Sequence, residues 1–163
     1  MRIREILDPH NIILDLRGTT KREILTALSR PIAESRKTID HARLVDALVK
    51  REETSTTAIA DGIAIPHGKL DIGEEVICGF GCSRPGLDFD SIDGKPTHLF
   101  FLLVSPESHP SLHLRWLAHL AVTLKDPQFR RVLAVANTPE DVLAAFDREE
   151  DTQLKKEASA RGS

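Results

Sequence analysis

The order of apolar and polar positions along the chain predicts strands that alternate with helices. Near the N-terminus, apolar residues cluster over 12–16 and stop before Gly18, as expected for a strand that ends in a turn. The stretch THLFFLLV at 97–104 is almost entirely apolar, which is typical of a central strand covered on both faces. The predicted strands cover residues 12–16, 63–65, 75–83 and 97–104.

Helical spacing and capping residues predict five helices. Thr19 or Thr20 caps the first, with Glu23 three residues after Thr20 as in a capping box, and this helix continues to about Ser35. The helix after His109 has an apolar stripe on one side. The stripe comprises Leu114, Leu117, Ala118 and Ala121, with Leu120 and Leu124 beside it. The last four helices begin at Asp40, His109, Asp126-Pro127 and Thr138-Pro139.

A single domain accounts for most of the chain, and the order of its elements predicts an α/β fold. No internal repeat or long linker divides the chain, so residues 1–150 are assigned to one domain with its own core. After Phe146 the sequence DREEDTQLKKEASARGS is polar and lacks periodicity. Residues 151–163 are therefore predicted to form a disordered tail.

Composition and charge narrow the function classes. The formal net charge is −3, which argues against a protein that binds nucleic acid by neutralising phosphates. Cys78 and Cys82 lie four residues apart in a predicted strand, too far for a relaxed disulfide, so free thiols and a cytoplasmic location are expected. No apolar run is long enough to span a bilayer, which predicts no direct insertion into a membrane.

The segment DGIAIPHGK, residues 61–69, presents a histidine at the end of a predicted strand. Pro66 is expected to end that strand because proline lacks a backbone donor. Gly68 lets a ligand or another backbone approach His67, and Lys69 adds a positive charge. The pattern predicts a histidine at the lip of a sheet, in surroundings that suit an anion. The alternative is an exposed loop histidine without a function.

The other histidines offer one competing site. His109 and His113 are four residues apart, which is the spacing of a two-histidine zinc site, but Pro110 puts His109 at or before the start of its helix. No Gly-rich loop leads into Lys-Ser/Thr, so binding of a dinucleotide or a nucleoside triphosphate is not predicted. The histidines expected to be structural or exposed are His10, His41, His98 and His119.

Three segments in series resemble one known family. They are REETSTTAIADGIAIPHGKL at 51–70, LDFDSIDGKPTHLFFLLVSP at 87–106 and HLRWLAHLAVTLKDPQFRR at 113–131. These segments resemble the enzyme IIA domains of the phosphoenolpyruvate-dependent phosphotransferase system, in the fructose/mannitol class that includes the nitrogen-regulatory IIA proteins. The resemblance covers about residues 1–147. It implies an α/β fold with a central mixed β-sheet flanked by helices.

The resemblance implies a role for each of three residues. His67 aligns with the histidine that accepts a phosphoryl group through Nε2, and Arg51 and His113 align with residues that stabilise that group. A neutral imidazole suits a nucleophile at cytoplasmic pH, and a guanidinium suits phosphoryl oxygens. Taken alone, His113 could be a core histidine and Arg51 a solvated charge at a helix end.

Partners follow from the same resemblance. It implies HPr or a nitrogen-branch HPr-like phosphocarrier as donor, and a IIB domain or regulatory targets such as kinases and transporters as further partners. It implies no cofactor and no metal. The chain is then a phosphotransferase component, a phosphohistidine carrier, rather than a stand-alone turnover enzyme. A regulatory role is favoured over a sugar-transport subunit, and a binding module that is never phosphorylated is the remaining alternative. Trp116 is a candidate surface contact, with a core position as its alternative.

Four residues depart from the usual wording of the family. Ser55, Ala58 and Ala60 stand where glycine is usual, and Asp61 stands where asparagine is common. Because alanine tolerates positive φ poorly, the loop is expected to avoid such angles or to carry strain. If Asp61 faced the site, its charge would oppose an incoming phosphoryl group and raise the pKa of His67.

Overall fold

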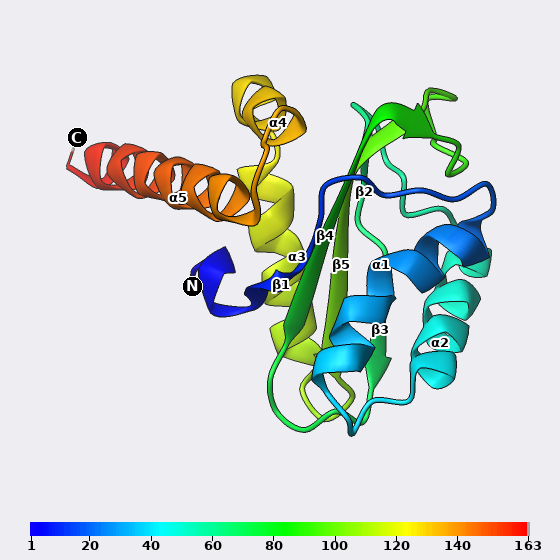
Figure 1. Ribbon diagram of the computed structural model, residues 1–163. Coiled ribbons are helices and arrows are strands. Elements are labelled where there is room, and N and C mark those ends of the chain that lie inside the picture. Colours follow the sequence, from blue (N-terminus) through cyan, green and yellow to red (C-terminus); the bar gives the residue numbers. More distant parts are fainter. Residues whose placement is uncertain (163) are drawn as a thin grey trace.

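Five strands form one mixed sheet in the computed structural model, which describes residues 1–162 (Figure 1). They are β1 (Leu7–Ile13), β2 (Ile63–Ala64), β3 (His67–Leu70), β4 (Ile77–Leu87) and β5 (Thr97–Pro106). β4 runs antiparallel to β5, whereas β1 is parallel to β4, and both β2 and β3 are parallel to β5. The predicted α/β fold with a mixed sheet is confirmed, and the apolar segment 97–104 lies in the central strand β5.

Helices cover both faces of this sheet (Figure 1). They are the 3-10 helix η1 (Ile3–Glu5) and the α-helices α1 (Lys21–Ser35), α2 (His41–Thr54), α3 (Pro110–Thr123), α4 (Pro127–Ala134) and α5 (Pro139–Arg161). α1 and α2 pack on one face, and α3, α4 and α5 lie on the other. Four helices begin at predicted caps, each of which accepts a backbone N–H with its side chain: Thr20, Asp40, Asp126 and Thr138.

β5 separates two apolar cores. Successive side chains of a strand point to opposite faces. Phe100 and Leu102 therefore join the cluster beneath α1 and α2, whereas Phe101 and Leu103 join the cluster beneath α3, α4 and α5. All four side chains are fully buried. A strand with both faces covered needs a continuous apolar run, which explains why its sequence pattern is so clear.

The first strand begins earlier than predicted, at Leu7 instead of residue 12. Leu7 pairs with Cys78 and Ile12 pairs with Phe80, so five residue steps in β1 match only two steps in β4. The extra residues include Pro9 and are exposed. They interrupt the apolar pattern at the edge of the sheet, which hides the first half of the strand from periodicity.

Pro66 interrupts the edge of the sheet without ending it. β2 stops at Ala64, and β3 resumes at His67 against the same strand β5. The carbonyl oxygen of Pro66 accepts a hydrogen bond from the amide of Leu103 at 3.0 Å, so the proline removes a donor but keeps its acceptor in the ladder. His67 is therefore the first residue of a strand, which corrects the expectation that the ladder ends before it.

The C-terminal segment is helical where the polar sequence predicts a disordered tail. Residues 151–161 continue α5 as an exposed helix that extends away from the sheet (Figure 1), and Ser163 lies outside the described residues. The prediction rests on polarity alone, but alanine, glutamate, lysine and glutamine are strong helix formers. The buried residues Phe146 and Glu150 anchor the preceding turns, and extending an existing helix avoids the cost of nucleation.

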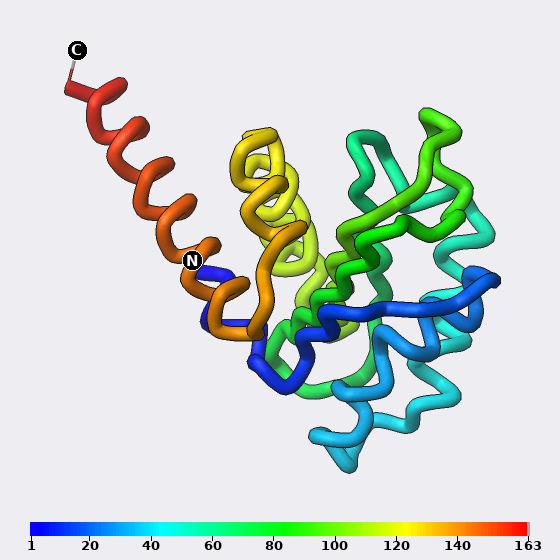
Figure 2. Tube along the Cα trace, turned by 45° about the horizontal axis from the view of Figure 1, so that its top comes forward, coloured from blue at the N-terminus to red at the C-terminus, as the bar shows by residue number. Residues whose placement is uncertain are grey.

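The N-terminus lies beside α5, as Figure 2 shows. The amide of Ile3 donates to Glu150 Oε2 at 3.1 Å, and His119 Nε2 lies 2.6 Å from the same oxygen. Arg4 forms an ion pair with Asp147 at 2.7 Å. These contacts join the two ends of the domain through the buried turn of α5.

The two cysteines are free thiols, as predicted. Cys78 and Cys82 are both buried in the core beneath α3, α4 and α5. Within residues 1–162, no helix combines the length and the apolar character needed to cross a bilayer.

Candidate functional site

His67 stands at the start of β3 with both ring nitrogens engaged. Its Nδ1 lies 2.9 Å from the carbonyl oxygen of Ile65, and its Nε2 lies 3.1 Å from Arg51 Nε. A carbonyl oxygen only accepts and a guanidinium nitrogen only donates. The neutral ring therefore carries its proton on Nδ1 and a lone pair on Nε2. Nε2 is therefore the ring nitrogen whose lone pair faces the guanidinium of Arg51.

Arg51 reaches this ring from the last turn of α2. Its Nε donates to His67, and its Nη1 donates to the carbonyl oxygen of Ser55 at 2.9 Å. The two contacts hold the planar guanidinium beside the ring. A guanidinium offers five N–H donors, so those left free by these contacts can meet an anion that arrives at Nε2.

His113 faces His67 from the first turn of α3. The two ring centroids are 5.1 Å apart. Its Nδ1 lies 2.6 Å from Ser105 Oγ at the end of β5, and the residue is only 4% exposed. His113 is thus both a buried histidine and a neighbour of the candidate nucleophile. The structure brings together all three site residues suggested by the sequence, from α2, β3 and α3.

The electrostatic surroundings keep both histidines neutral. Burial lowers the pKa of His67, the positive charge of Arg51 lowers it further, and the hydrogen bond to Ile65 opposes this shift. Burial also lowers the pKa of His113 to about 4, with smaller contributions from the charges of His67, Lys69 and Arg51. At neutral pH His67 Nε2 therefore carries a lone pair and no proton, and this lone pair accepts the hydrogen bond from Arg51.

An open cavity of about 560 Å³ connects these side chains. Its positive charges come from Arg51, Lys50 and Lys69, so an anion is favoured at its centre. Leu114 and Leu117 add apolar surface on one side. The cavity therefore combines a positively charged centre with an apolar rim, defined here as Leu114 and Leu117.

The apolar rim comes from the outward side of α3. Leu114 is 66% exposed, and Ala118 and Ala121 on the same stripe are exposed too. The buried side carries Trp116 and Leu120, so Trp116 occupies the core and not the surface. The stripe read from the sequence faces solvent because α3 is apolar on both sides, and the larger aromatic side chain takes the core position.

The glycine after His67 packs closely against α2. A Cβ at Gly68 would lie 3.3 Å from Leu48 Cδ2 and 3.9 Å from Ala47 Cβ. The backbone that approaches this glycine is thus the helix α2. Close contact between β3 and α2 brings His67 within reach of Arg51.

The loop before His67 adopts positive φ only where it is tolerated. Asp61 has a φ of 59° and Gly62 a φ of 76°, whereas Ala58 and Ala60 are not in this region. Aspartate and glycine are among the residues that accept it most readily. The amide of Asp61 donates to Asp93 at 3.3 Å, in the turn between β4 and β5. The loop therefore accommodates its two alanines without positive φ.

Glu52 is a buried carboxylate beside the site. It is not among the residues identified from the sequence, although the pattern of α2 contains a signal for it. It follows Arg51 directly and is 5% exposed. Leu44, Leu48 and Glu52 follow one another at four-residue spacing on the inner face of α2, and a charge on such an apolar stripe signals a buried polar contact. Ser105, at the end of an apolar strand, carries no comparable signal.

Most other histidines have structural partners. His119 pairs with Glu150, and His41 Nε2 lies 3.0 Å from Ser29 Oγ, in agreement with a structural role for both. His109 stands just before α3, as Pro110 indicates. Within residues 1–162, no three His, Cys, Asp or Glu side chains converge as ligands for a metal ion. The zinc alternative therefore lacks a third ligand among these side chains.

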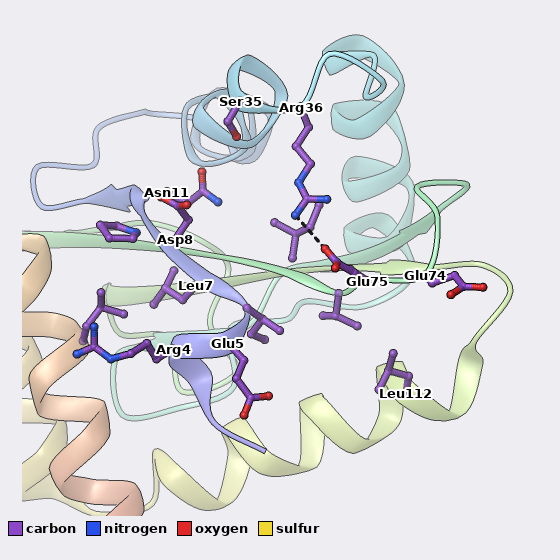
Figure 3. Close-up of a pocket in the computed structure, with 15 residues that line it drawn as sticks. Arg4, Glu5, Leu7, Asp8, Asn11, Ser35, Arg36, Glu74, Glu75 and Leu112 are labelled. Carbon is purple, nitrogen blue, oxygen red and sulfur yellow. Dashed lines mark hydrogen bonds and ion pairs between the residues drawn. The ribbon is translucent and has the colours of Figure 1, made fainter.

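A second cavity, of about 450 Å³, lies along β1 (Figure 3). Charged side chains of both signs line it, and Arg36 and Glu75 approach to 3.5 Å across it. Asp8 and Asn11 contribute to it from β1. No histidine is among the described residues that line this cavity, so the chemistry suggested by the sequence belongs to the cavity at His67.

The protein belongs to the enzyme IIA family of the phosphotransferase system. A family model described as "Phosphoenolpyruvate-dependent sugar phosphotransferase system, EIIA 2" matches residues 5–149. The match spans the sheet, the two cores except for Ile3, and all three side chains of the site. The resemblance noted from three sequence segments is thereby confirmed.

Relatives of two kinds match this chain. A nitrogen regulatory protein of Bradyrhizobium diazoefficiens is 33% identical over 146 residues, which are 90% of this chain and 95% of that protein. The fructose-specific EIIABC component of Bacillus subtilis is 31% identical over 88% of this chain, but the chain spans only 22% of that protein. The crystal structure of the nitrogen regulatory protein IIA-Ntr from Neisseria meningitidis is 30% identical with a TM-score of 0.81, covering 88% of this chain and 98% of that one.

The lowered pKa of His113 predicts a loss of stability in acid. In the unfolded chain a histidine titrates near ~6.5, whereas folded His113 titrates at about 4. Between these values the unfolded state binds more protons, so the free energy of unfolding decreases as pH falls. We expect His113 to contribute about 2–3 kcal/mol to the decrease between pH 7 and pH 4.5.

Urea unfolding at both pH values measures this effect. The variant His113→Gln removes the titrating ring and keeps a polar side chain for Ser105. Its free energy of unfolding should change less with pH than that of the wild type. An equal pH dependence in the two proteins would show that His113 titrates normally in the folded state.

Proposed function

We propose that the protein is a phosphoryl carrier of the phosphoenolpyruvate-dependent phosphotransferase system, with His67 Nε2 as the acceptor and an HPr-type phosphocarrier as the donor. The observation that carries this proposal is the state of the His67 ring, whose proton is held on Nδ1 by Ile65 while Nε2 faces Arg51. A neutral nucleophile beside a fixed positive charge suits attack on a phosphoryl group. Family membership supports the same chemistry.

The transfer step exchanges one P–N bond for another. The lone pair of His67 Nε2 forms a bond to phosphorus while the P–N bond of the donor's phosphohistidine breaks, and the donor imidazole recovers its electron pair. The proton on Nδ1 stays in its hydrogen bond to Ile65, which stabilises the positive charge that the ring gains. No separate base is needed.

Arg51 and His113 stabilise the phosphoryl group during this step. As the new bond forms, the Arg51 guanidinium turns from Nε2 to the phosphoryl oxygens, and its contact with Ser55 keeps it within reach. In the tautomer that donates, Ser105 Oγ–H occupies His113 Nδ1, and His113 Nε2–H is free to donate to a phosphoryl oxygen. Preorganised donors of this kind supply the charge stabilisation that phosphoryl transfer requires.

The surface around the cavity suits a protein partner. The apolar rim of Leu114 and Leu117 lies beside the positive charges of Lys50 and Lys69. Protein interfaces commonly combine an apolar centre with a polar border. A phosphocarrier with an apolar patch next to its phosphohistidine can cover this rim while its phosphoryl group enters the positively charged centre.

A regulatory role of the nitrogen type is the favoured context. The nitrogen regulatory relative and the IIA-Ntr structure align with this chain over almost their whole lengths. In this role the free and phosphorylated forms bind different targets, such as kinases or transporters, in the cytoplasm where phosphocarriers operate. The fructose-specific relative favours a second candidate, a transport subunit that passes the phosphoryl group to a IIB domain.

Phosphorylation in a reconstituted system tests the proposal. The purified protein is mixed with phosphoenolpyruvate, enzyme I and either HPr or its nitrogen-branch relative, and its intact mass is followed. We expect the mass of one acid-labile phosphoryl group to appear with at least one carrier. If a control IIA protein is labelled and the present protein is not, the present protein is not a phosphoryl carrier. Rapid loss of the label to an added IIB domain favours transport, and retention favours regulation.

A further inference from the structure

A buried carboxylate organises the segment that holds Arg51. Glu52 accepts hydrogen bonds from the amide of Thr57 at 2.7 Å and from its hydroxyl at 2.5 Å, and Lys21 Nζ on α1 donates to it at 3.0 Å. The side chain of Glu52 is 3% exposed. Three donors converge on one carboxylate, so its negative charge is compensated although water is excluded.

These bonds connect Glu52 to the groups that orient both reacting side chains. Ser55, whose carbonyl oxygen holds Arg51, lies in the short segment that ends at Thr57. The carbonyl oxygen of Thr57 accepts from the amide of Ile65 at 3.1 Å, and the carbonyl oxygen of Ile65 in turn holds the imidazole of the acceptor. One carboxylate thus fastens a backbone segment that leads to both the guanidinium and the imidazole.

We propose that Glu52 is a positioning residue for phosphoryl transfer, because through Thr57 it fixes the backbone carbonyls that hold Arg51 and His67 in register. This inference rests on the proposed function and adds a residue to it. Glu52 does not touch the phosphoryl group. It keeps the carbonyl of Ser55 in place, so that the guanidinium stays near the acceptor nitrogen when it turns to the incoming oxygens.

The negative charge of Glu52 has a second effect on the acceptor. It acts to raise the pKa of His67, against the lowering caused by burial and by Arg51. The imidazole therefore keeps more of its basicity than burial alone allows. A more basic nitrogen is the better nucleophile as long as it remains neutral, so this effect acts in the same direction as the positioning.

Glutamine at position 52 tests the proposal with almost no change in shape. Its amide is neutral, with one acceptor oxygen and a donor NH₂ group, whereas the carboxylate accepts from the amide and hydroxyl of Thr57 and from the ammonium of Lys21. The NH₂ group can keep a bond to the Thr57 hydroxyl only if that hydroxyl turns and accepts, so Glu52→Gln replaces charge-assisted hydrogen bonds by weaker neutral ones and loosens the loop. Glu53→Gln is the matched control, because it makes the same chemical change at the next position of α2, where the side chain is exposed.

We expect Glu52→Gln to slow phosphorylation at saturating phosphocarrier by about 10- to 100-fold, because small misplacements of catalytic groups have effects of this size. The KM for the carrier should stay unchanged, since Glu52 is buried and lies outside the docking surface. In an Arg51→Ala background the same substitution should have a smaller further effect, because the part that acts through Ser55 and Arg51 is already lost and only the part that acts through His67 remains. Glu53→Gln should behave as the wild type.

A direct readout that needs no phosphoryl donor accompanies the rates. In ¹⁵N NMR spectra of the wild type, Arg51 Nε–H is expected as a hydrogen-bonded signal protected from exchange, and Glu52→Gln should lose this protection. Thr57→Val removes one of the two threonine donors and should weaken the same signal. That variant decides the question if Glu52→Gln does not fold, as checked by circular dichroism.

The outcomes separate this inference from the proposed function. If Arg51 Nε–H stays protected in both Glu52→Gln and Thr57→Val, Glu52 does not position Arg51 and the inference is overturned. A full additional loss of rate in the Arg51→Ala background overturns it as well. If the wild type is not phosphorylated by either carrier, the proposed function fails, and the NMR signal still decides whether Glu52 fixes Arg51.

Discussion

Replacement of His67 by alanine is expected to abolish phosphorylation of the protein by any HPr-type carrier. The reason is that His67 Nε2 is the proposed nucleophile, whereas His113, with its Nδ1 on Ser105, is proposed to act as a donor to the phosphoryl group. The loss should be complete within the sensitivity of intact mass measurement. The fold should persist, because His67 is partly exposed and opens an edge segment of the sheet.

Two further histidine variants are the controls for this result. His10→Ala removes an exposed histidine of β1 and should leave labelling unchanged. His113→Ala should slow labelling without abolishing it, because a donor is lost while the nucleophile remains. Persistent labelling of the His67→Ala protein would mean that another side chain accepts the phosphoryl group, and the assignment of Nε2 as the nucleophile would be wrong.

Replacement of Arg51 by alanine is expected to slow phosphorylation by about 10²–10³-fold, the usual effect of removing a preorganised donor to developing charge. Arg51 lies 3.1 Å from the acceptor nitrogen and is held by Ser55, so its contribution requires both charge and geometry. Arg51→Lys should recover only part of the rate. An ammonium restores the positive charge but cannot donate to His67 and to Ser55 in the same fixed geometry.

Lys50→Ala is the matched control for this effect. Lys50 also lines the cavity and carries the same charge, but of these two residues it is Arg51 that donates to the ring of His67. Stopped-flow or quenched labelling should therefore show a much larger loss at position 51 than at position 50. Equal losses would indicate that the cavity attracts the donor through its overall charge and that the guanidinium has no specific role.

The parts of the fold that can be predicted from sequence are those that obey local rules. The central strand can be recognised from the sequence, because a strand with both faces covered needs a continuous apolar run such as that around Phe100 and Phe101. Helix starts are predictable because one side chain, such as Thr20 or Asp126, satisfies the free N–H groups. Pairing across an edge, as in β1, depends on a distant partner and leaves a weaker pattern.

In the site, too, local features can be predicted from the sequence and contacts between distant segments cannot. The sequence identifies His67 as a candidate because it lies between a proline and a glycine. Its position next to Arg51 and His113 follows from the packing of α2 and α3, which periodicity alone does not predict. The family resemblance supplied that relation. Ser105 orients His113 through a contact between β5 and α3, and such a contact between distant segments has no signature in either segment alone.

The outward extension of α5 determines the direction and the mobility of any group attached to this end of the domain. The eleven positions from 151 to 161 would span about 16 Å as a helix with a rise of 1.5 Å per residue. A reporter or a further protein segment joined to Arg161 would then move with the domain as on a semi-rigid spacer, whereas a flexible tether would let it sample all directions. The α5 end therefore offers an attachment point for distance measurements, with its direction set by the buried turn at Glu150.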